Sequence, residues 1–194
     1  MIFIQPENPK YGRIADPEKA AVGSLEEINT AWLTRFLILA GAAIFLPFFI
    51  HLPWITGPII NAILILVLFL CGRSSAFLVC FLPSFMALSG GLLPLALAPT
   101  IPFIIAGNLI FIFLIDWFYK RSRSDLKGYF SGVLAGAILK FAFLFFSVNL
   151  LAALLIKAPI MPLVIKMLGL SQLITALAGG AIAWFILRFL KYFK

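Results

Sequence analysis

Charged side chains are scarce in this chain of 194 residues, at 11%, against about 25% in ordinary soluble domains. Hydrophobic residues make up 63% of the chain, and its mean hydropathy is +1.14. No soluble core can hide this much apolar side chain, so the composition excludes an ordinary globular protein. A spanning helix needs about 20 mainly apolar residues, and six such helices fit into the chain. We predict an all-α integral membrane protein.

The residue types that carry most enzyme chemistry are scarce too. The chain has one histidine, His51, and two cysteines, Cys71 and Cys80, without C-x-x-C spacing. One histidine cannot build a His-based metal site, and we interpret the cysteines as small apolar side chains. The sequence contains no G-x-x-x-x-G-K-[ST] phosphate loop and no H-E-x-x-H motif. We therefore expect neither an enzyme nor a cofactor or metal site.

Positive charge is plentiful, with a net charge of +8, but it does not indicate nucleic acid. The basic residues flank apolar spans and form no groove-reading motif, which is typical of the positive-inside rule and of contact with anionic lipid headgroups. Residues 1–30 hold many charges and no apolar signal-peptide core. We expect a polar cytoplasmic lead over 1–30 and a six-helix membrane domain over 31–194.

Apolar segments alternate with polar or Gly/Pro-rich breaks along the membrane domain. Ser24 and Glu27 fit a capping box just before the first segment, and Gly57-Pro58 predicts the start of the second. The stretch "SGGLLPLALAPTIP" predicts a turn or a re-entrant loop. The expected spans cover about residues 31–50, 56–71, 76–88, 100–119, 128–156 and 163–189.

The basic residues are distributed unevenly between the two sides of such a bundle. With six spans, the lead, the loop after span two, the loop after span four and the tail share one side, and they hold most of the 15 Lys and Arg residues. The opposite side has Lys157 and Lys166, and Lys140 lies within span five. The positive-inside rule then predicts that both termini are cytoplasmic.

Lys140 is the most informative single residue, because an ionisable side chain near mid-bilayer is costly and marks a functional candidate. Gly132, Gly136 and Ser147 share its helical face, and the glycines let another helix approach closely. Lys140 either faces the bundle interior or snorkels towards the cytoplasmic headgroups, and the sequence leaves both open.

Other i, i+4 patterns predict local contacts. Asp116 and Lys120 are expected to pair on one helix. Thr175, Gly179 and Ala183 are expected to form a helix-packing face in span six. Neither pattern by itself implies chemistry.

Four amide side chains fall in the outer half of the predicted bilayer, each on a different span, and Trp54 lies at the interface beside them. Each amide alone fits an interhelical hydrogen bond. Their common side favours a polar cavity that opens outward. The candidate binding residues are Asn61, Asn108, Lys140, Asn149, Gln172 and Trp54.

Several stretches carry a resemblance to a known family: "TGPIINAILIL", the turn at Gly72, "LLPLALAPTIPF", "IAGN" and "SQLITALAGGAIA". Over about residues 30–194 the chain resembles the substrate-binding (S) components of prokaryotic energy-coupling factor (ECF) transporters. The resemblance implies six helices with cytoplasmic termini in the plasma membrane, and an outer pocket for a vitamin or other small nutrient. It also implies a separate coupling protein and two ATPases as partners. Where that family often has Ala-xxx-Ala on its first helix, this chain has Ala40-Gly41-Ala42-Ala43.

Two functions remain open from the sequence. In the first, a nutrient enters from outside and binds among the four amides, and Lys140 pairs with any carboxylate or phosphate that it carries. In the second, the chain is a non-transporting membrane scaffold or assembly factor, and the amides serve only helix packing.

Overall fold

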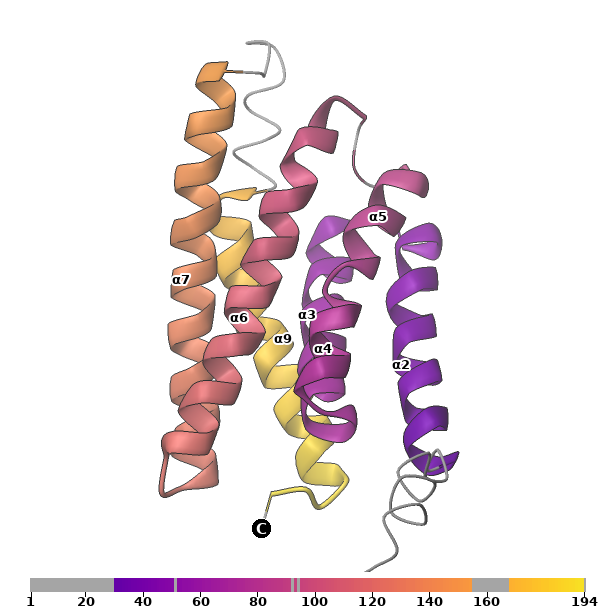
Figure 1. Cartoon of the computed structure of the whole chain (residues 1–194), viewed down its shortest axis with the longest axis vertical. Coiled ribbons are helices and arrows are strands. Elements are labelled where there is room, and N and C mark those ends of the chain that lie inside the picture. Colours follow the sequence, from indigo (N-terminus) through magenta and orange to yellow (C-terminus); the bar gives the residue numbers. More distant parts are fainter. Residues whose placement is uncertain (1–29, 51, 92, 94, 155–167, 194) are drawn as a thin grey trace, which may run out of the picture.

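The computed structural model describes residues 30–50, 52–91, 93, 95–154 and 168–193. This part of the chain is helical and contains no strand (Figure 1). The elements are α2 (Thr30–Phe49), α3 (Pro53–Cys71), α4 (Arg73–Val79), α5 (Leu82–Ser89), the 3-10 helix η1 (Leu95–Thr100), α6 (Ile101–Arg121), α7 (Asp125–Leu154) and α9 (Leu170–Phe189).

Five helical stretches are long and apolar enough to cross a membrane, so the chain is a helical membrane protein. The third predicted span is different: it forms α4 and α5, which together cover only Arg73–Ser89. Among the described residues, five helices therefore reach spanning length rather than six. The spanning stretches are Thr30–Phe49, Trp54–Cys71, Leu97–Arg121, Asp125–Ser147 and Leu170–Phe189.

The break between α4 and α5 has a local cause. Pro83 stands in the first turn of α5, where its missing N–H and fixed φ are tolerated, and it disfavours one continuous helix through this point. After α5 the chain turns at Gly90-Gly91, and Gly91 has a φ of +74°, which suits glycine. The described part of the predicted turn or re-entrant loop is thus a tight turn followed by η1, which leads directly into α6.

Helix α3 begins about one turn earlier than the sequence pattern predicted. Pro53 occupies the first turn, and Gly57-Pro58 lies inside the helix. Proline is well placed at a helix start because its absent N–H would have had no partner there. The hydroxyl of Thr56 donates to the Ile50 carbonyl at 2.7 Å and ties this first turn to the preceding chain.

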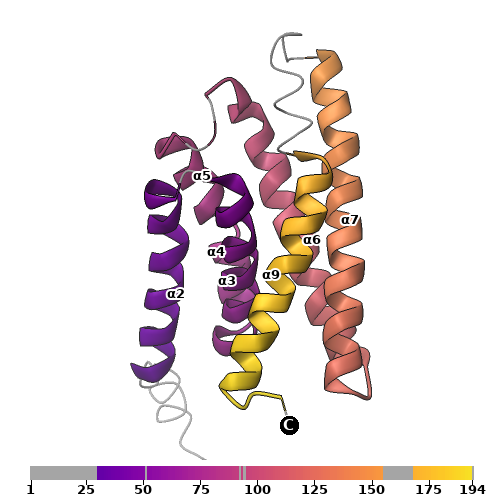
Figure 2. The same ribbon diagram turned by 180° about the vertical axis from the view of Figure 1, so that it is seen from behind.

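The helices pack in two close pairs, α6 with α7 and α3 with α9, and α2 lies at the far edge against α3 and α5 (Figures 1 and 2). Glycines make both pairs possible. A Cβ at Gly132 would lie 2.8 Å from the Ile115 Cα, and one at Gly179 would lie 2.7 Å from the Pro58 carbonyl oxygen. The predicted packing faces around Gly132 and Gly179 are confirmed, because Thr175 and Ala183 are also buried.

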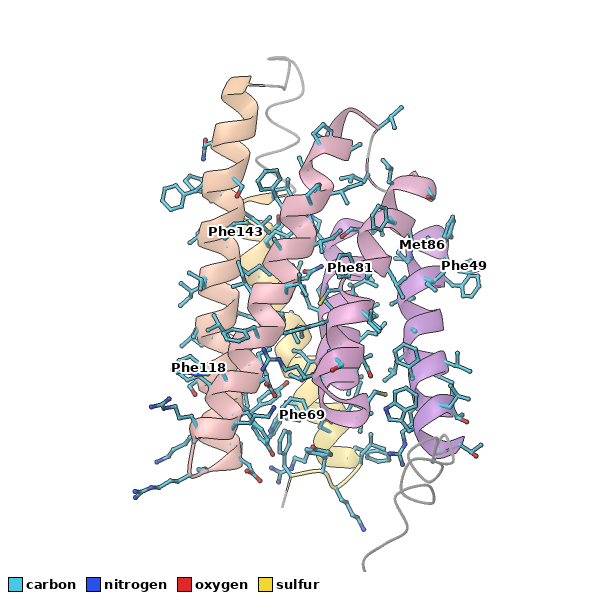
Figure 3. All side chains as sticks on the ribbon, viewed as in Figure 1. Phe49, Phe69, Phe81, Met86, Phe118 and Phe143 are labelled. Atoms are coloured by element: carbon cyan, nitrogen blue, oxygen red, sulfur yellow. The ribbon has the colours of Figure 1, made fainter. Side chains whose placement is uncertain are left out.

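Large apolar side chains lie on both the inside and the outside of the bundle (Figure 3). Phe49 points away from α2 and is 79% exposed, as expected of a side chain that meets lipid. Phe69 is partly buried and packs against the core, in ring contact with Tyr119 at 4.9 Å and with Tyr129 at 5.7 Å between centroids. Tyr129 is fixed there because its hydroxyl donates to the Gly180 carbonyl at 2.7 Å and joins α7 to α9.

Positive charge gathers at one end of the bundle, which we call the basic end. The start of α2 meets the end of α3 there, where the Trp32 indole N–H donates to the Cys71 carbonyl at 2.9 Å. The end of α6, the start of α7 and the end of α9 lie at the same end (Figure 1). Apart from Lys140, the described basic residues all belong to it: Arg35, Arg73, Lys120, Arg121, Arg123, Lys127, Arg188 and Lys191.

Candidate functional site

Lys140 lies inside the bundle and does not snorkel towards an end. Its side chain comes from the middle of α7, and the residue is 2% exposed. The Lys140 Nζ donates to the Asn61 Oδ1 of α3 at 2.8 Å. Of the two orientations that the sequence left open, the structure therefore has the interior one, and two predicted site residues are in direct contact.

Small residues make room for this lysine between the helices. A Cβ at Gly107 of α6 would lie 3.4 Å from the Lys140 Cγ, so the stem of the lysine passes close to the α6 backbone. One turn further along α6, the ring of Phe111 has its centroid 5.4 Å from the Lys140 Nζ. The negative face of an aromatic ring attracts a cation, which gives the ammonium a second contact.

Asn61 is held in one orientation. Its Nδ2 donates to the Gly57 carbonyl one turn earlier at 3.0 Å, which leaves its Oδ1 to accept from Lys140. The Asn61 Cβ also lies against α9, where a Cβ at Gly179 would come within 2.6 Å of it. The backbone of α3 and the packing of α9 thus aim the amide oxygen at the lysine.

The Lys140 ammonium has no carboxylate partner in the described part of the chain. The acidic residues there are Asp116 and Asp125, and both belong to the basic end. Of its three N–H groups, one donates to Asn61, and the described residues provide no second hydrogen bond. Burying a charge without an opposite charge is expensive, so this contact is not explained by stability alone.

Asn108 and Ser84 are two more of the buried polar side chains. Asn108 is 4% exposed, follows Gly107 and precedes Phe111 by one turn. The Ser84 Oγ of α5 is buried and has no partner within the described ranges. The sequence predicted Asn108 as a site residue. It did not predict Ser84, although the position of this serine within an apolar segment could have indicated it.

The remaining predicted site residues lie apart from Lys140. Trp54 stands in the first turn of α3 and is 52% exposed. Asn149 is exposed on α7, and its Nδ2 donates to the Phe145 carbonyl of its own helix at 2.7 Å. Gln172 is partly buried in the first turn of α9. All three residues belong to the half of the bundle away from the basic end, so they lie on the same side of the bundle, as predicted. Their side chains do not contact Lys140.

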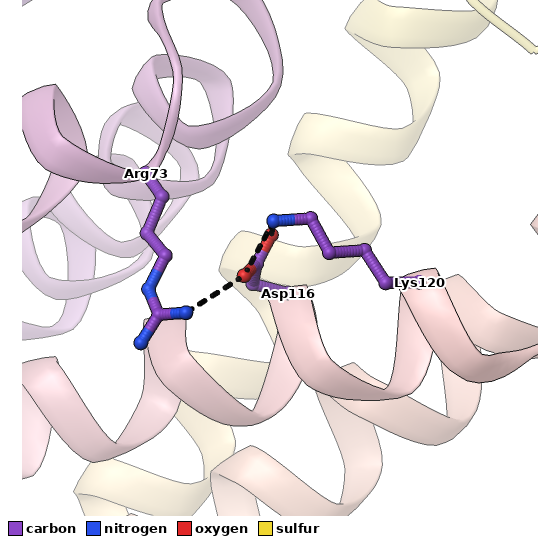
Figure 4. Close-up of polar contacts among 3 residues, drawn as sticks. All are labelled: Arg73, Asp116 and Lys120. Carbon is purple, nitrogen blue, oxygen red and sulfur yellow. Dashed lines mark hydrogen bonds and ion pairs between the residues drawn. The ribbon is translucent and has the colours of Figure 1, made fainter.

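A second polar cluster lies at the basic end (Figure 4). The predicted pair on α6 is confirmed: the Lys120 Nζ lies 2.8 Å from the Asp116 Oδ1. Arg73 of α4 joins it from another helix, with its Nη1 3.6 Å from the Asp116 Oδ2. The sequence did not indicate Arg73, because the two residues belong to helices whose packing no local pattern specifies.

Comparison of the chain with protein-family models, curated proteins and solved structures gave no match. Within the described ranges, no group of three or more His, Cys, Asp or Glu side chains is placed to hold a metal ion. Cys71 and Cys80 are both buried free thiols there, as expected of apolar side chains. Residues His51 and 155–167 lie outside the described ranges, and with them the predicted break between the spans at 128–156 and 163–189.

Proposed function

We propose that the chain is the substrate-capture subunit of an ECF-type importer in the plasma membrane of a prokaryote. It takes up a vitamin or another small nutrient from outside. A separate coupling protein and two ATPase subunits supply the energy, because this sequence contains no phosphate-binding loop of its own. The proposal rests on the resemblance described above and on one structural observation.

That observation is the Lys140–Asn61 contact. An intramembrane cation normally pairs with an acid or a polar partner, and such residues mark substrate or ion pathways. Here the only described hydrogen-bond partner is a neutral amide, so two N–H donors of Lys140 remain for a ligand. A carboxylate or phosphate on the nutrient supplies the missing opposite charge.

The distribution of charge supports the orientation that an importer requires. The positive-inside rule places the basic end in the cytoplasm, where the coupling protein and the ATPases act. In this arrangement α4 and α5 together make the sixth crossing, and both termini are cytoplasmic. The buried amide Asn108 then lies on the path from the outer side to Lys140.

The test is ligand retention by matched lysine variants. Lys140→Met keeps the length of the side chain and removes its charge, and Lys127→Met makes the same change at an exposed site on the same helix. Protein purified in mild detergent is analysed by native mass spectrometry and by binding to a vitamin panel. We expect the wild type and Lys127→Met to retain a small anionic molecule, and Lys140→Met to lose at least about 90% of it, because a charge-assisted contact contributes at least about 1.5 kcal/mol.

Two outcomes count against the importer. One is a wild-type protein that carries no small molecule and binds none in the panel. The other is a folded Lys140→Met variant, shown by an unchanged thermal transition, that retains the ligand as well as the wild type does.

A membrane scaffold remains the second candidate, and specific contacts favour it. Asn61 joins α3 to α7 through its hydrogen bond with Lys140, as an amide that only packs helices would, and the amide of Asn149 is bound within its own helix. Co-purification separates the two functions. Recovery of a coupling protein with two ATPases supports the importer, and recovery of a biosynthetic or secretion complex supports the scaffold.

A further inference from the structure

The basic end carries an open hollow that the substrate site does not use. It has a volume of about 270 Å³ and lies on the face of α6, beside the start of α4. Its floor is the carboxylate of Asp116, which is 9% exposed, while the charged side chains around it reach outward. The lining residues are Arg73, Phe113, Asp116, Trp117, Lys120 and Arg121.

The charge of this hollow is positive even after its internal ion pairs are counted. Among the described lining residues, Asp116 is the single acid and Arg73, Lys120 and Arg121 are basic. Its carboxylate holds Arg73 from α4 and Lys120 from its own helix (Figure 4). The side chains of Arg73 and Lys120 are nevertheless 44% and 65% exposed, so their remaining donors stay open to a ligand. Asp116 therefore positions the cations and does not neutralise them all.

Aromatic rings hold the two arginines in place. The Arg73 guanidinium lies 5.0 Å from the centroid of Phe77 and 5.1 Å from that of Phe113. The Arg121 guanidinium lies 5.5 Å from the centroid of Trp117. A guanidinium stacked on rings loses less side-chain entropy when it binds a phosphate in its bidentate geometry than a free one does.

Two of these rings also indicate that the hollow lies at the membrane surface. Phe113 and Trp117 are both exposed on the surface of α6, in a membrane-spanning stretch that ends at Arg121. Tryptophan is enriched where the hydrocarbon core meets the headgroups. The hollow thus combines cations on its aqueous side with apolar rings on its hydrocarbon side. A soluble phosphate can use only the cations, whereas a phospholipid can use the cations with its phosphate and the apolar rings with its acyl chains.

We propose that this hollow binds the phosphate of an anionic phospholipid, with Arg73, Lys120 and Arg121 as its cationic contacts. The part of the lipid's acyl chains nearest the headgroup lies along the rings of Phe113 and Trp117. This site is independent of the importer proposal, because it requires only that the helices span a membrane.

The experiment measures lipid preference in the intact chain. Wild-type protein in nanodiscs made from equal amounts of phosphatidylglycerol and phosphatidylcholine is released into the gas phase, and the retained lipids are counted by native mass spectrometry. The test variant is Arg73→Gln with Arg121→Gln. The matched control is Arg123→Gln with Lys127→Gln, which removes the same charge at the same end of the bundle but outside the hollow.

We expect the wild type and the control to prefer phosphatidylglycerol, and the test variant to lose about tenfold in preference for each charge-assisted hydrogen bond to the phosphate that is removed. Equal loss in both double variants, or none in the test variant, overturns the proposal. Inorganic phosphate added in excess should not displace the lipid, and displacement would show a soluble-anion site instead. If the test variant does not fold, the wild-type preference must still fall as salt shortens the screening length from about 10 Å at 0.1 M to about 3 Å at 1 M.

Discussion

Lys140 and Lys120 show two ways of placing a lysine in the same membrane protein. Lys120 lies at the basic end, where water already stabilises a charge, and it has a carboxylate 2.8 Å away. Lys140 lies deep between helices, where a charge is most expensive, and its partner is the neutral amide of Asn61. The lysine in the less demanding place therefore has a carboxylate partner, which it shares with Arg73, and the deep lysine has none among the described residues. This difference is the reason why we propose a ligand-binding role for Lys140.

The largest expected effect comes from removing the amide that Lys140 uses. Asn61→Leu leaves the ammonium buried without its hydrogen-bond acceptor, and we expect a loss of about 3 kcal/mol in the free energy of unfolding. Chemical unfolding in detergent micelles, followed by tryptophan fluorescence, measures it.

Asn149→Leu is the matched control for that substitution. It makes the same change at an exposed amide whose bond is to its own helix, so we expect a change within about 0.5 kcal/mol. A combined Lys140→Met and Asn61→Leu variant should recover most of the loss, because the pair is replaced by apolar groups together. Equal losses in Asn61→Leu and Asn149→Leu would show that the buried amide contributes no more to the free energy of unfolding than the exposed one.

The next effect concerns the packing that aims Asn61. In Gly179→Ala the new Cβ would meet the Asn61 Cβ at 2.6 Å and the Pro58 carbonyl at 2.7 Å, so α3 and α9 must separate. We expect a loss of about 1–3 kcal/mol in unfolding free energy, together with weaker ligand retention. The control is Gly41→Ala in α2, where no atom lies within 4 Å of the new Cβ and added helix propensity gives no loss. A harmless Gly179→Ala would show that the orientation of Asn61 does not depend on α9.

The smallest effect is expected at the basic end. Asp116→Asn removes the carboxylate shared by Arg73 and Lys120, but both cations are well exposed and keep contact with water. We expect a loss of only about 1 kcal/mol in the same unfolding measurement. A loss as large as that of Asn61→Leu would mean that the two regions do not differ in the way described.

The sequence was sufficient for the helices and for much of their packing. Lipid offers the backbone no hydrogen bonds, so long apolar stretches must be helical, and this reasoning located α2, α3, α6, α7 and α9. The small residues at i, i+4 spacing in α7 and α9 predicted which faces of these helices are buried, whereas the sequence left open whether Lys140 points into the bundle. These are local patterns within single helices.

The contacts between helices were not predictable in the same way. Lys140 and Asn61 are 79 residues apart, and nothing in either segment specifies the other as a neighbour. Arg73 meets Asp116 only because α4 folds back against α6. The interruption of the third span also escaped prediction, since Pro83 is compatible both with a kinked span and with two short helices.

The bond from the Asn61 Nδ2 to the Gly57 carbonyl has a consequence for selectivity. Because one N–H of the Asn61 amide is bonded to the α3 backbone, the orientation of the amide is fixed and its oxygen faces the Lys140 ammonium. A ligand at the centre of the bundle would therefore meet the hydrogen-bond donors and the positive charge of Lys140. Under the importer proposal, we expect this centre to favour an acceptor-rich or anionic molecule over metal cations and protonated amines.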